Sequence, residues 1–159
     1  MTRHAKNIAF DPINLPTEER NPYPAPFDTV LNGRMRRVIG DVNGLTKFGV
    51  NLTELLPGAV SALRHWHSKE DEFIYIIEGN PTLITNDGAQ PLKPGFCACF
   101  PAGSENAHRL ENTTNLRVLY LEVGNRSNGE EVFYPDNNML LDKSKNGTRI
   151  FKKLDGSSF

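Results

Sequence analysis

Cysteine is scarce in this sequence of 159 residues, which limits the cross-links that the chain can form. The two cysteines, Cys97 and Cys99, are separated by one residue. On a strand they would share one face, with Cα atoms roughly 6.5 Å apart, near the upper limit for a disulfide. A Cys-x-Cys pair can also offer two thiolates to a soft metal. The simplest interpretation is that both are small, buried apolar residues.

Long apolar runs and an excess of charge of one sign are also missing. No stretch is long enough to span a membrane, and Met1 to Phe10 lack the apolar core of a signal peptide. We therefore expect a cytoplasmic protein without a membrane partner. The 18 basic and 19 acidic residues give a formal net charge of -1, and Arg34, Arg36 and Arg37 form only a small basic cluster. Nucleic acid is not an expected partner, because phosphate binding requires a concentrated positive face.

Proline, in contrast, is concentrated near the N-terminus. At this density it blocks helices and internal ladder positions of a sheet, which predicts an extended arm over residues 1–33. Such an arm can be disordered, or it can wrap the rest of the chain or a neighbouring subunit. Beyond it we expect a barrel over residues 34–126 and a C-terminal extension over residues 127–159 that packs on the barrel. The prolines of the arm are Pro12, Pro16, Pro22, Pro24 and Pro26.

Short β segments separated by turn signals follow one another from Leu45 onward. Asp87-Gly88 is typical of a hairpin, because both positions tolerate positive φ. No amphipathic helix is predicted, even between Asn128 and Phe159, so we expect the C-terminal extension to be irregular. Many short strands at this spacing indicate an all-β sandwich or barrel, which also avoids exposed sheet edges. The predicted strands are Lys47–Leu55, Ser61–His67, Glu72–Glu78, Thr82–Asn86, Phe96–Phe100, His108–Asn112 and Leu116–Val123.

Histidine is also scarce, and the chain has only His4, His65, His67 and His108. Two of them form the sequence His65-Trp66-His67 inside a predicted strand. Because side chains alternate across a strand, His65 and His67 point to the same face and Trp66 points away. Two neighbouring imidazoles can chelate a metal, but surface strands also carry such pairs by chance.

Glu72 opens the next predicted strand after a short polar turn, so it can stand beside the histidine pair. It heads an otherwise apolar row that continues with Ile74 and Ile76. A buried carboxylate beside two imidazoles is costly unless a cation pairs with it, and a divalent cation is the natural partner. Spacing alone leaves a metal site and a solvated polar face equally open.

The stretch from Gly58 to Gly79 resembles the first motif of the cupin family. That motif reads glycine, five residues, His-x-His, three or four residues, glutamate, six residues and glycine. The part from His65 to Gly79 matches it, with four residues before Glu72 and six after it. At the start, six residues rather than five separate Gly58 from His65.

A later stretch resembles the second cupin motif, which reads glycine, five residues, Pro-x-Gly, two residues, histidine, three residues and asparagine. The matching residues are Gly95, Pro101, Gly103, His108 and Asn112. Four residues rather than two separate Gly103 from His108, an insertion that a loop would tolerate. The sequences that flank both motifs look like those of a small bacterial cupin subgroup.

The resemblance implies a double-stranded β-helix, or jelly-roll, cupin barrel with one divalent metal near one end. Carried over residue by residue, it implies His65, His67, Glu72 and His108 as the metal ligands. Imidazole and carboxylate suit Fe, Mn, Ni, Zn or Cu, so the metal identity stays open. Structural metal sites tend to be closed and rich in cysteine, whereas these ligands leave two positions of a six-coordinate ion for water, substrate or dioxygen.

Two classes of function remain open. One is a metalloenzyme, such as an oxygenase, isomerase or lyase, that acts on a small polar molecule: a hydroxy acid, a keto acid or a sugar derivative. Its metal would act as a Lewis acid or, if it is iron, activate dioxygen. The other is a non-catalytic binding or sensor protein that uses the same pocket, because cupins include both. Ile74 and Tyr120 are candidate lining residues of that pocket, and core packing is the simpler interpretation for Tyr120.

We also expect a homodimer. Small cupins often dimerise, and the proline-rich arm needs a surface to pack against. Trp66, Phe73 and Tyr75 supply a candidate apolar outer face for the contact between two copies.

Overall fold

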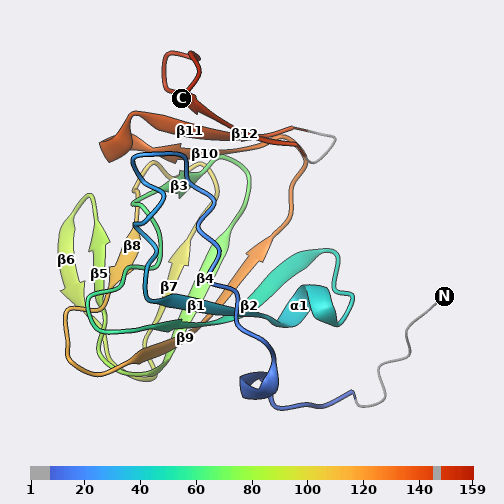
Figure 1. Ribbon diagram of the computed structural model, residues 1–159, viewed down its shortest axis with the longest axis vertical. Coiled ribbons are helices and arrows are strands. Elements are labelled where there is room, and N and C mark those ends of the chain that lie inside the picture. The colour runs from blue at the N-terminus through green and yellow to red at the C-terminus, as the bar shows by residue number, and fades with distance from the viewer. Residues whose placement is uncertain (1–7, 145–147) are drawn as a thin grey trace.

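The computed structural model describes residues 8–144 and 148–159. The first seven residues of the predicted arm, His4 among them, lie outside the described residues. Besides 3₁₀ helices at Pro12–Asn14 and Pro135–Asn137 and a short helix α1, Ile39–Val42, the described regular structure is all strand (Figure 1). The strands are β1 Arg34–Val38, β2 Phe48–Leu55, β3 Trp66–His67, β4 Glu72–Glu78, β5 Thr82–Thr85, β6 Gly88–Pro91, β7 Cys97–Phe100, β8 Arg109–Glu111, β9 Val118–Asn125, β10 Glu130–Tyr134, β11 Met139–Lys143 and β12 Arg149–Lys153.

The strands form three antiparallel sheets. Their strand orders are β1-β2-β9-β4-β7, β12-β11-β10-β3 and β6-β5-β8. The neighbours β2 and β9 are far apart in sequence, as are β9 and β4, which is the crossing pattern of a jelly roll. The predicted all-β jelly-roll fold is therefore confirmed. In the described part of the chain, no helix is both long enough and apolar enough to cross a membrane.

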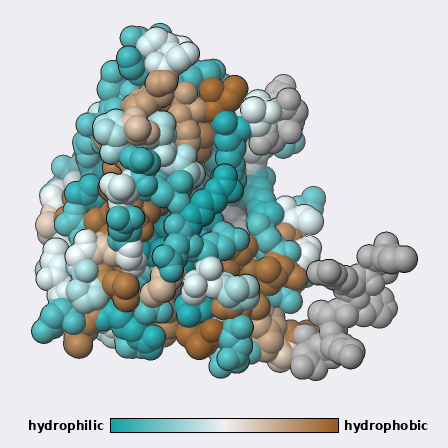
Figure 2. All heavy atoms as spheres, viewed as in Figure 1, coloured by the Kyte–Doolittle hydropathy of each residue, from teal (hydrophilic) through white to brown (hydrophobic). Residues whose placement is uncertain are grey.

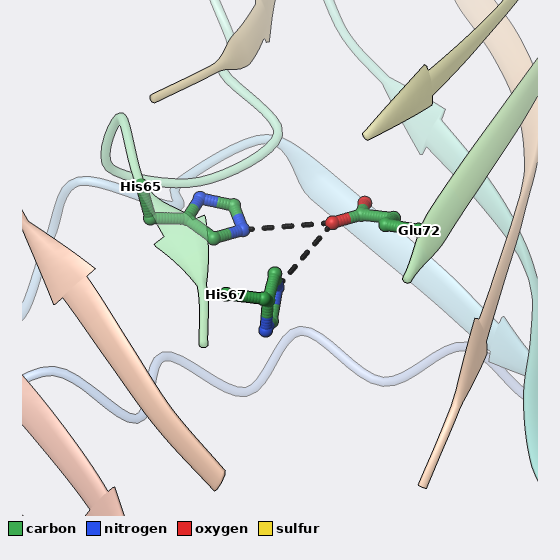
Figure 3. A group of neighbouring side chains, drawn as sticks. All are labelled: His65, His67 and Glu72. Carbon is green, nitrogen blue, oxygen red and sulfur yellow. Dashed lines mark ion pairs between the residues drawn. The ribbon is translucent and has the colours of Figure 1, made fainter. Parts of the chain in front are cut away.

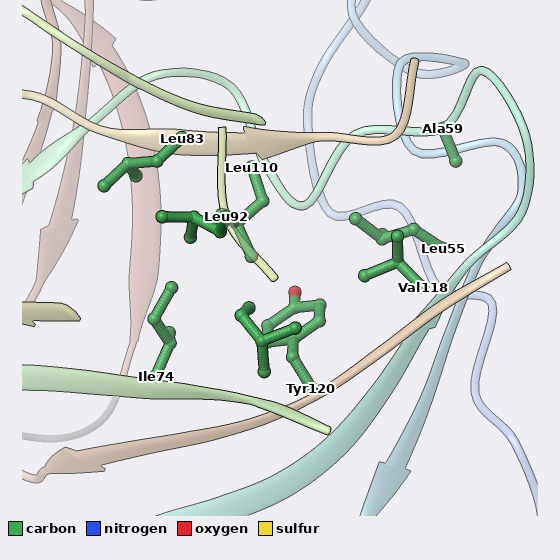
Figure 4. Packing of buried hydrophobic residues seen from close by; sticks show 9 residues of the cluster. Leu55, Ala59, Ile74, Leu83, Leu92, Leu110, Val118 and Tyr120 are labelled. Atoms are coloured by element: carbon green, nitrogen blue, oxygen red, sulfur yellow. The ribbon is translucent and has the colours of Figure 1, made fainter. Parts of the chain in front are cut away.

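The strands form because apolar residues alternate with partly exposed ones. On β4, Ile74 and Ile76 are 3% and 0% exposed, whereas Tyr75 and Ile77 are 42% and 44% exposed. A period of two places the first pair inside the barrel and the second pair on its outer face. Inside, they join the apolar cluster of Figure 4. Its members are Leu55, Ala59, Ile74, Ile76, Leu83, Leu92, Leu110, Val118 and Tyr120.

The C-terminal extension is not irregular, and this part of the expectation is wrong. It forms β10, β11 and β12, which extend the sheet from β3 and lie together at one end of the molecule in Figure 1. Val132 and Tyr134 on β10 and Met139 and Leu141 on β11 alternate and are buried in a second apolar cluster. Each strand offers only two such residues, which is too short a pattern to stand out in the sequence.

The described part of the N-terminal arm wraps its own chain. Tyr23 is buried in the second cluster, where its ring meets Tyr134 edge-on at 5.5 Å. Glu18 forms an isolated β bridge with Arg36 and so covers the outer edge of β1, which would otherwise be open. In Figure 1 the arm runs as a dark blue trace beside β3 and β10. The domain boundaries at residues 33 and 126 stay a prediction.

Cys97 and Cys99 are exposed and unbonded, so their interpretation as buried residues is wrong. They lie on β7, the edge strand of the five-stranded sheet, opposite Tyr75 and Phe73. That register places both thiols on the outer face of the sheet. The sequence showed that the two cysteines share a face but not which face it is.

Two glycines with nearly the same backbone angle generate a prediction about stability. Gly79 has φ +82°, and a Cβ there would overlap the carbonyl oxygen of Arg117 and lie 2.9 Å from Val118 Cα. Gly58 has φ +83° and no described atom within 4 Å of such a Cβ. Gly58→Ala should cost about 1–2 kcal/mol for the left-handed backbone. Gly79→Ala should cost a further 1–3 kcal/mol, roughly, for overpacking.

Urea unfolding followed by circular dichroism measures the free energy of unfolding of both variants. Equal losses of stability in the two would contradict the close packing of Gly79 against the start of β9.

Candidate metal centre

The backbone brings the three histidines together. His65 and His108 face each other across an isolated antiparallel bridge, in which each N–H donates to the other's carbonyl, at 3.1 and 2.8 Å. Opposite residues of such a pair project their side chains to the same face, and His67 follows two residues after His65. The ring of His65 consequently lies 5.1 Å from that of His67 and 4.7 Å from that of His108, between centroids.

The longer spacing before His108 does not disturb this arrangement. Gly103 N–H donates to the carbonyl of His67 at 2.8 Å, and the chain rejoins the bridge at His108. The extra residues of the second motif fall between these two fixed points, in the loop at residues 104–107.

Glu72 reaches the histidines from the five-stranded sheet, where it opens β4. Its Oε2 lies 3.1 Å from Nε2 of His108, 3.4 Å from Nε2 of His67 and 3.7 Å from Nε2 of His65. Figure 3 shows the side chain of Glu72 pointing toward the rings of His65, which directly precedes β3, and His67, which lies on β3. Three ring nitrogens, two from His65 and His67 and one from His108, therefore converge on one carboxylate oxygen.

The hydrogen bonds of Nδ1 in His65 and His67 determine whether the Nε2 atom of each neutral ring carries a proton or a lone pair. The Nδ1 of His65 lies 2.8 Å from the Leu63 carbonyl oxygen, and the Nδ1 of His67 lies 3.1 Å from Glu130 Oε1. Both partners can only accept, so each Nδ1 carries the proton, and in a neutral ring Nε2 keeps its lone pair. Two lone pairs then face a carboxylate oxygen, an arrangement that is repulsive unless a cation lies among them.

Protons supply positive charge in the absence of a metal. Burial by itself lowers the pKa of His67, but hydrogen bonds with Glu130 and Glu72 outweigh burial and raise that pKa to about 9. Burial tends to raise the pKa of Glu72, yet hydrogen bonds with His108, His65 and His67 hold it well below its usual value. Burial also lowers the pKa of His108. A divalent cation can take over the role of the His67 proton, so the donor set fits a metal.

Apolar rings cover two sides of the donor set. Phe100 stacks on His108 with centroids 3.5 Å apart and an interplanar angle of 6°, and Tyr134 lies 5.7 Å from the His65 ring. Phe100 packs on the first apolar cluster and Tyr134 belongs to the second, so the donors lie between the two. Charges interact more strongly in such an environment than in water.

A cavity of about 310 Å³ adjoins the donor set and gives space for a small molecule. His67 and His108 are part of its wall. Trp66, expected to face away from the site, also lines it, although the ring stacks on Phe133 at 4.2 Å. The remaining lining residues are Leu83, Thr85, Asp87, Gln90, Ala98, Cys99, Phe100, Pro101, Ser104 and Asn106.

The structure brings the four predicted ligands together. Donor atoms of His65, His67 and Glu72 all lie within 4.8 Å of one another, and His108 joins them through Glu72. That these residues bind a metal stays a prediction.

The two candidate pocket residues, Ile74 and Tyr120, belong to the apolar cluster inside the barrel. Neither is among the residues that line the 310 Å³ cavity. Their role toward a ligand stays a prediction.

Sequence reasoning missed a second group of donors, His67, Glu70 and Glu130, which also lie within 4.8 Å of one another. Glu130 opens β10 and is completely buried. Its signal in the sequence is weak, because it is one of two successive glutamates in a segment that was expected to be irregular. Asp87, Gln90 and the other polar residues of the cavity were missed because they lie in turns and edge strands.

Comparison with protein families places residues 51–124 in the Cupin domain family, a segment that contains all four predicted ligands. The comparison with curated proteins gives no match. A crystal structure from Silicibacter pomeroyi, described as a sugar phosphate isomerase from a cupin superfamily, is 37% identical. It covers 95% of this chain and 96% of its own, with a TM-score of 0.91.

Two further solved structures are more distant. One, from Acidithiobacillus ferrooxidans and provisionally assigned as a sugar phosphate isomerase, is 27% identical over 79% of this chain and 80% of its own, with a TM-score of 0.73. The polyketide cyclase RemF from Streptomyces resistomycificus is 21% identical over 74% of this chain and 78% of its own, with a TM-score of 0.61, and shares the fold alone. By sequence motifs, fold and its 37% identical relative, the chain belongs to the cupin superfamily.

Proposed function

We propose that the chain is a metalloenzyme, which binds one divalent transition metal through His65, His67, Glu72 and His108. The observation that carries this proposal is the convergence of three Nε2 atoms on Glu72 Oε2 at 3.1–3.7 Å. Ligand atoms bonded to one ion at about 2.1 Å and at right angles lie about 3 Å apart. The separations in the protein are close to that value. Fe, Mn, Ni, Zn and Cu all suit the donors.

The substrate in this proposal is a small polar molecule, such as a hydroxy acid, a keto acid or a sugar derivative. A bound metal would supply Lewis acidity to adjacent oxygen atoms of such a molecule. In the cavity, Asp87, Gln90 and Asn106 offer hydrogen-bond partners to hydroxyl groups, while Trp66 and Phe100 offer flat apolar surfaces. Asn106 Nδ2 donates to Asp87 Oδ2 at 2.8 Å, which orients both side chains.

Among these classes a sugar derivative and an isomerase reaction have the most support, because the 37% and 27% identical relatives reported above are both described as sugar phosphate isomerases. The cytoplasmic location expected from the sequence is part of the same proposal. The alternative is a non-catalytic binding or sensor protein with the same metal site. The ligand experiment below distinguishes it from an enzyme.

Metal content tests the ligand assignment directly. Elemental analysis of the purified protein should find close to one transition-metal ion per chain. His67→Ala should lose most of it, because the variant removes one of the three imidazoles that face Glu72. The control His4→Ala changes the one histidine outside the predicted set and should keep the metal. Stoichiometric metal in a folded His65→Ala/His67→Ala variant would contradict the assignment of these residues as ligands.

Ligand binding tests the open positions of the metal. A panel of hydroxy acids, keto acids, sugars and sugar phosphates is added to protein loaded with Fe(II), Mn(II) or Zn(II). A ligand at a hundred times its Kd stabilises the native state by about 2.7 kcal/mol, which should raise Tm by on the order of 5–10 °C. Metal-free protein should show no shift, because the ligand contacts the metal.

The same panel separates an enzyme from a binding protein. Turnover of a hit that is lost in folded Glu72→Gln and His108→Ala supports the enzyme. Tight, metal-dependent binding without product identifies a binding or sensor protein instead. If no member of the panel binds in a metal-dependent way, both the enzyme and the binding protein are contradicted.

The outer face of the five-stranded sheet supports the expected homodimer. Tyr75 and Ile77 of β4 are about two-fifths exposed there, beside Phe73 and the exposed Cys97 and Cys99 of β7. Within the described chain, β7 pairs on one side only, with β4, so its other edge is open. We propose that a second copy of the chain covers this face. On the face viewed in Figure 2, hydrophobic residues form separate groups among hydrophilic ones.

A charge placed on this face tests the dimer. Light scattering of the wild type at micromolar concentration should give twice the chain mass of 17.8 kDa. Tyr75→Glu should give the single-chain mass, because the carboxylate would be buried in the contact. Leu154→Glu adds the same charge at a 45% exposed residue that follows β12, a strand of another sheet, and should leave the dimer intact. A wild type of 17.8 kDa would exclude the homodimer.

A further inference from the structure

The three histidines of the proposed metal centre are supported in three different ways. The Nδ1 of His65 is held by a backbone carbonyl, and that of His108 is buried with no hydrogen-bond partner in the described part of the chain. The Nδ1 of His67 is held by a carboxylate, Glu130. Of the three histidines, His67 is therefore the one whose Nδ1 contacts a charged group that is not itself a predicted ligand.

Glu130 is built into the protein as a fixed acceptor. It is 0% exposed, and its oxygens accept from Ser68 N–H at 3.0 Å and Lys69 N–H at 2.7 Å in addition to His67. The pairing of Val132 with His67 fixes β10 beside β3 and so fixes the position of Glu130. A buried carboxylate without donors would be strongly destabilising, and here each oxygen has two.

A second metal ion is the competing interpretation of the group formed by His67, Glu70 and Glu130. The carboxylate of Glu70 pairs with Lys143 Nζ at 2.6 Å and accepts from Ser127 N–H at 3.0 Å. Glu130 is already bonded to main-chain N–H groups. Both carboxylates thus have cationic or N–H partners from the protein itself, and the group does not need a metal.

We propose that Glu130 is a positioning residue of the metal centre, which holds His67 as the Nδ1–H tautomer with its Nε2 lone pair directed at the metal. The inference rests on the proposed metal binding. A ring without this acceptor is free to turn or to present a proton to the metal. A carboxylate behind the ring also makes Nε2 a stronger donor. The C-terminal strands then contribute to metal affinity as well as to packing.

The matched variants Glu130→Gln and Glu70→Gln test this role. Both remove one negative charge beside His67, but Glu70 lies 3.9 Å from Nδ1, beyond hydrogen-bonding distance. Competition with a chelator measures the affinity of the folded proteins for Zn²⁺. Glu130→Gln should bind about 10–100-fold more weakly than the wild type. Glu70→Gln should stay within roughly threefold. The visible spectrum of bound Co²⁺ should change in Glu130→Gln alone.

Wild-type affinity in Glu130→Gln, or equal losses in the two variants, would overturn the inference. If Glu130→Gln does not fold, long-range ¹H–¹⁵N spectra of the Zn²⁺-loaded wild type decide. They should show His67 protonated at Nδ1 and metal-bound at Nε2, and the opposite pattern overturns the inference. A wild type that binds no Zn²⁺ or other transition metal overturns the proposed function together with this inference. A wild type that binds while Glu130→Gln is unchanged overturns this inference alone.

Discussion

The contact between the Glu72 carboxylate and three imidazole nitrogens is the constraint on which the rest of the structure depends. The carboxylate lies between two apolar clusters, where an uncompensated charge is costly. The proton that His67 gains satisfies it only in part, because in a neutral His65 ring, whose Nδ1–H is donated to the Leu63 carbonyl, Nε2 still directs a lone pair at the carboxylate. A divalent cation satisfies the carboxylate and the lone pairs at once, which is why the arrangement favours a metal over a structural ion-pair network.

Rigid placement of the donors follows from where the sheets meet. Glu72 comes from the five-stranded sheet, and His67 comes from the short strand that the C-terminal strands extend. His108 precedes β8 of the three-stranded sheet and is tied to His65 by two backbone hydrogen bonds. Donors that are held by packed sheets keep their geometry better than donors on free loops. The β3 strand of only two residues is sufficient because β10 pairs with it and the His65–His108 bridge lies directly before it.

The sequence predicted well which three histidines and which glutamate lie together, and it predicted the sheet edges poorly, for physical reasons. His65, His67, Glu72 and His108 belong to motifs whose spacing survives in a single chain, and β4 has a long alternating pattern. The edge strands β1 and β6 and the terminal β10–β12 bury few residues each, so their alternation is faint. Glu130 escaped notice because a buried acid has no local signature, and its partners lie some 60 residues earlier in the chain.

The two terminal segments each orient one histidine of the His-x-His pair. Tyr23 of the arm accepts the N–H of Leu63 at 3.3 Å, and the carbonyl of Leu63 accepts the Nδ1–H of His65. Glu130 of β10 does the same directly for His67. Both segments lie outside residues 51–124, the part that matches the Cupin domain, yet the 37% identical relative covers 95% of the chain. The unit that shapes the candidate metal centre is therefore longer than the barrel: arm, barrel and C-terminal strands together fix the rings of His65 and His67.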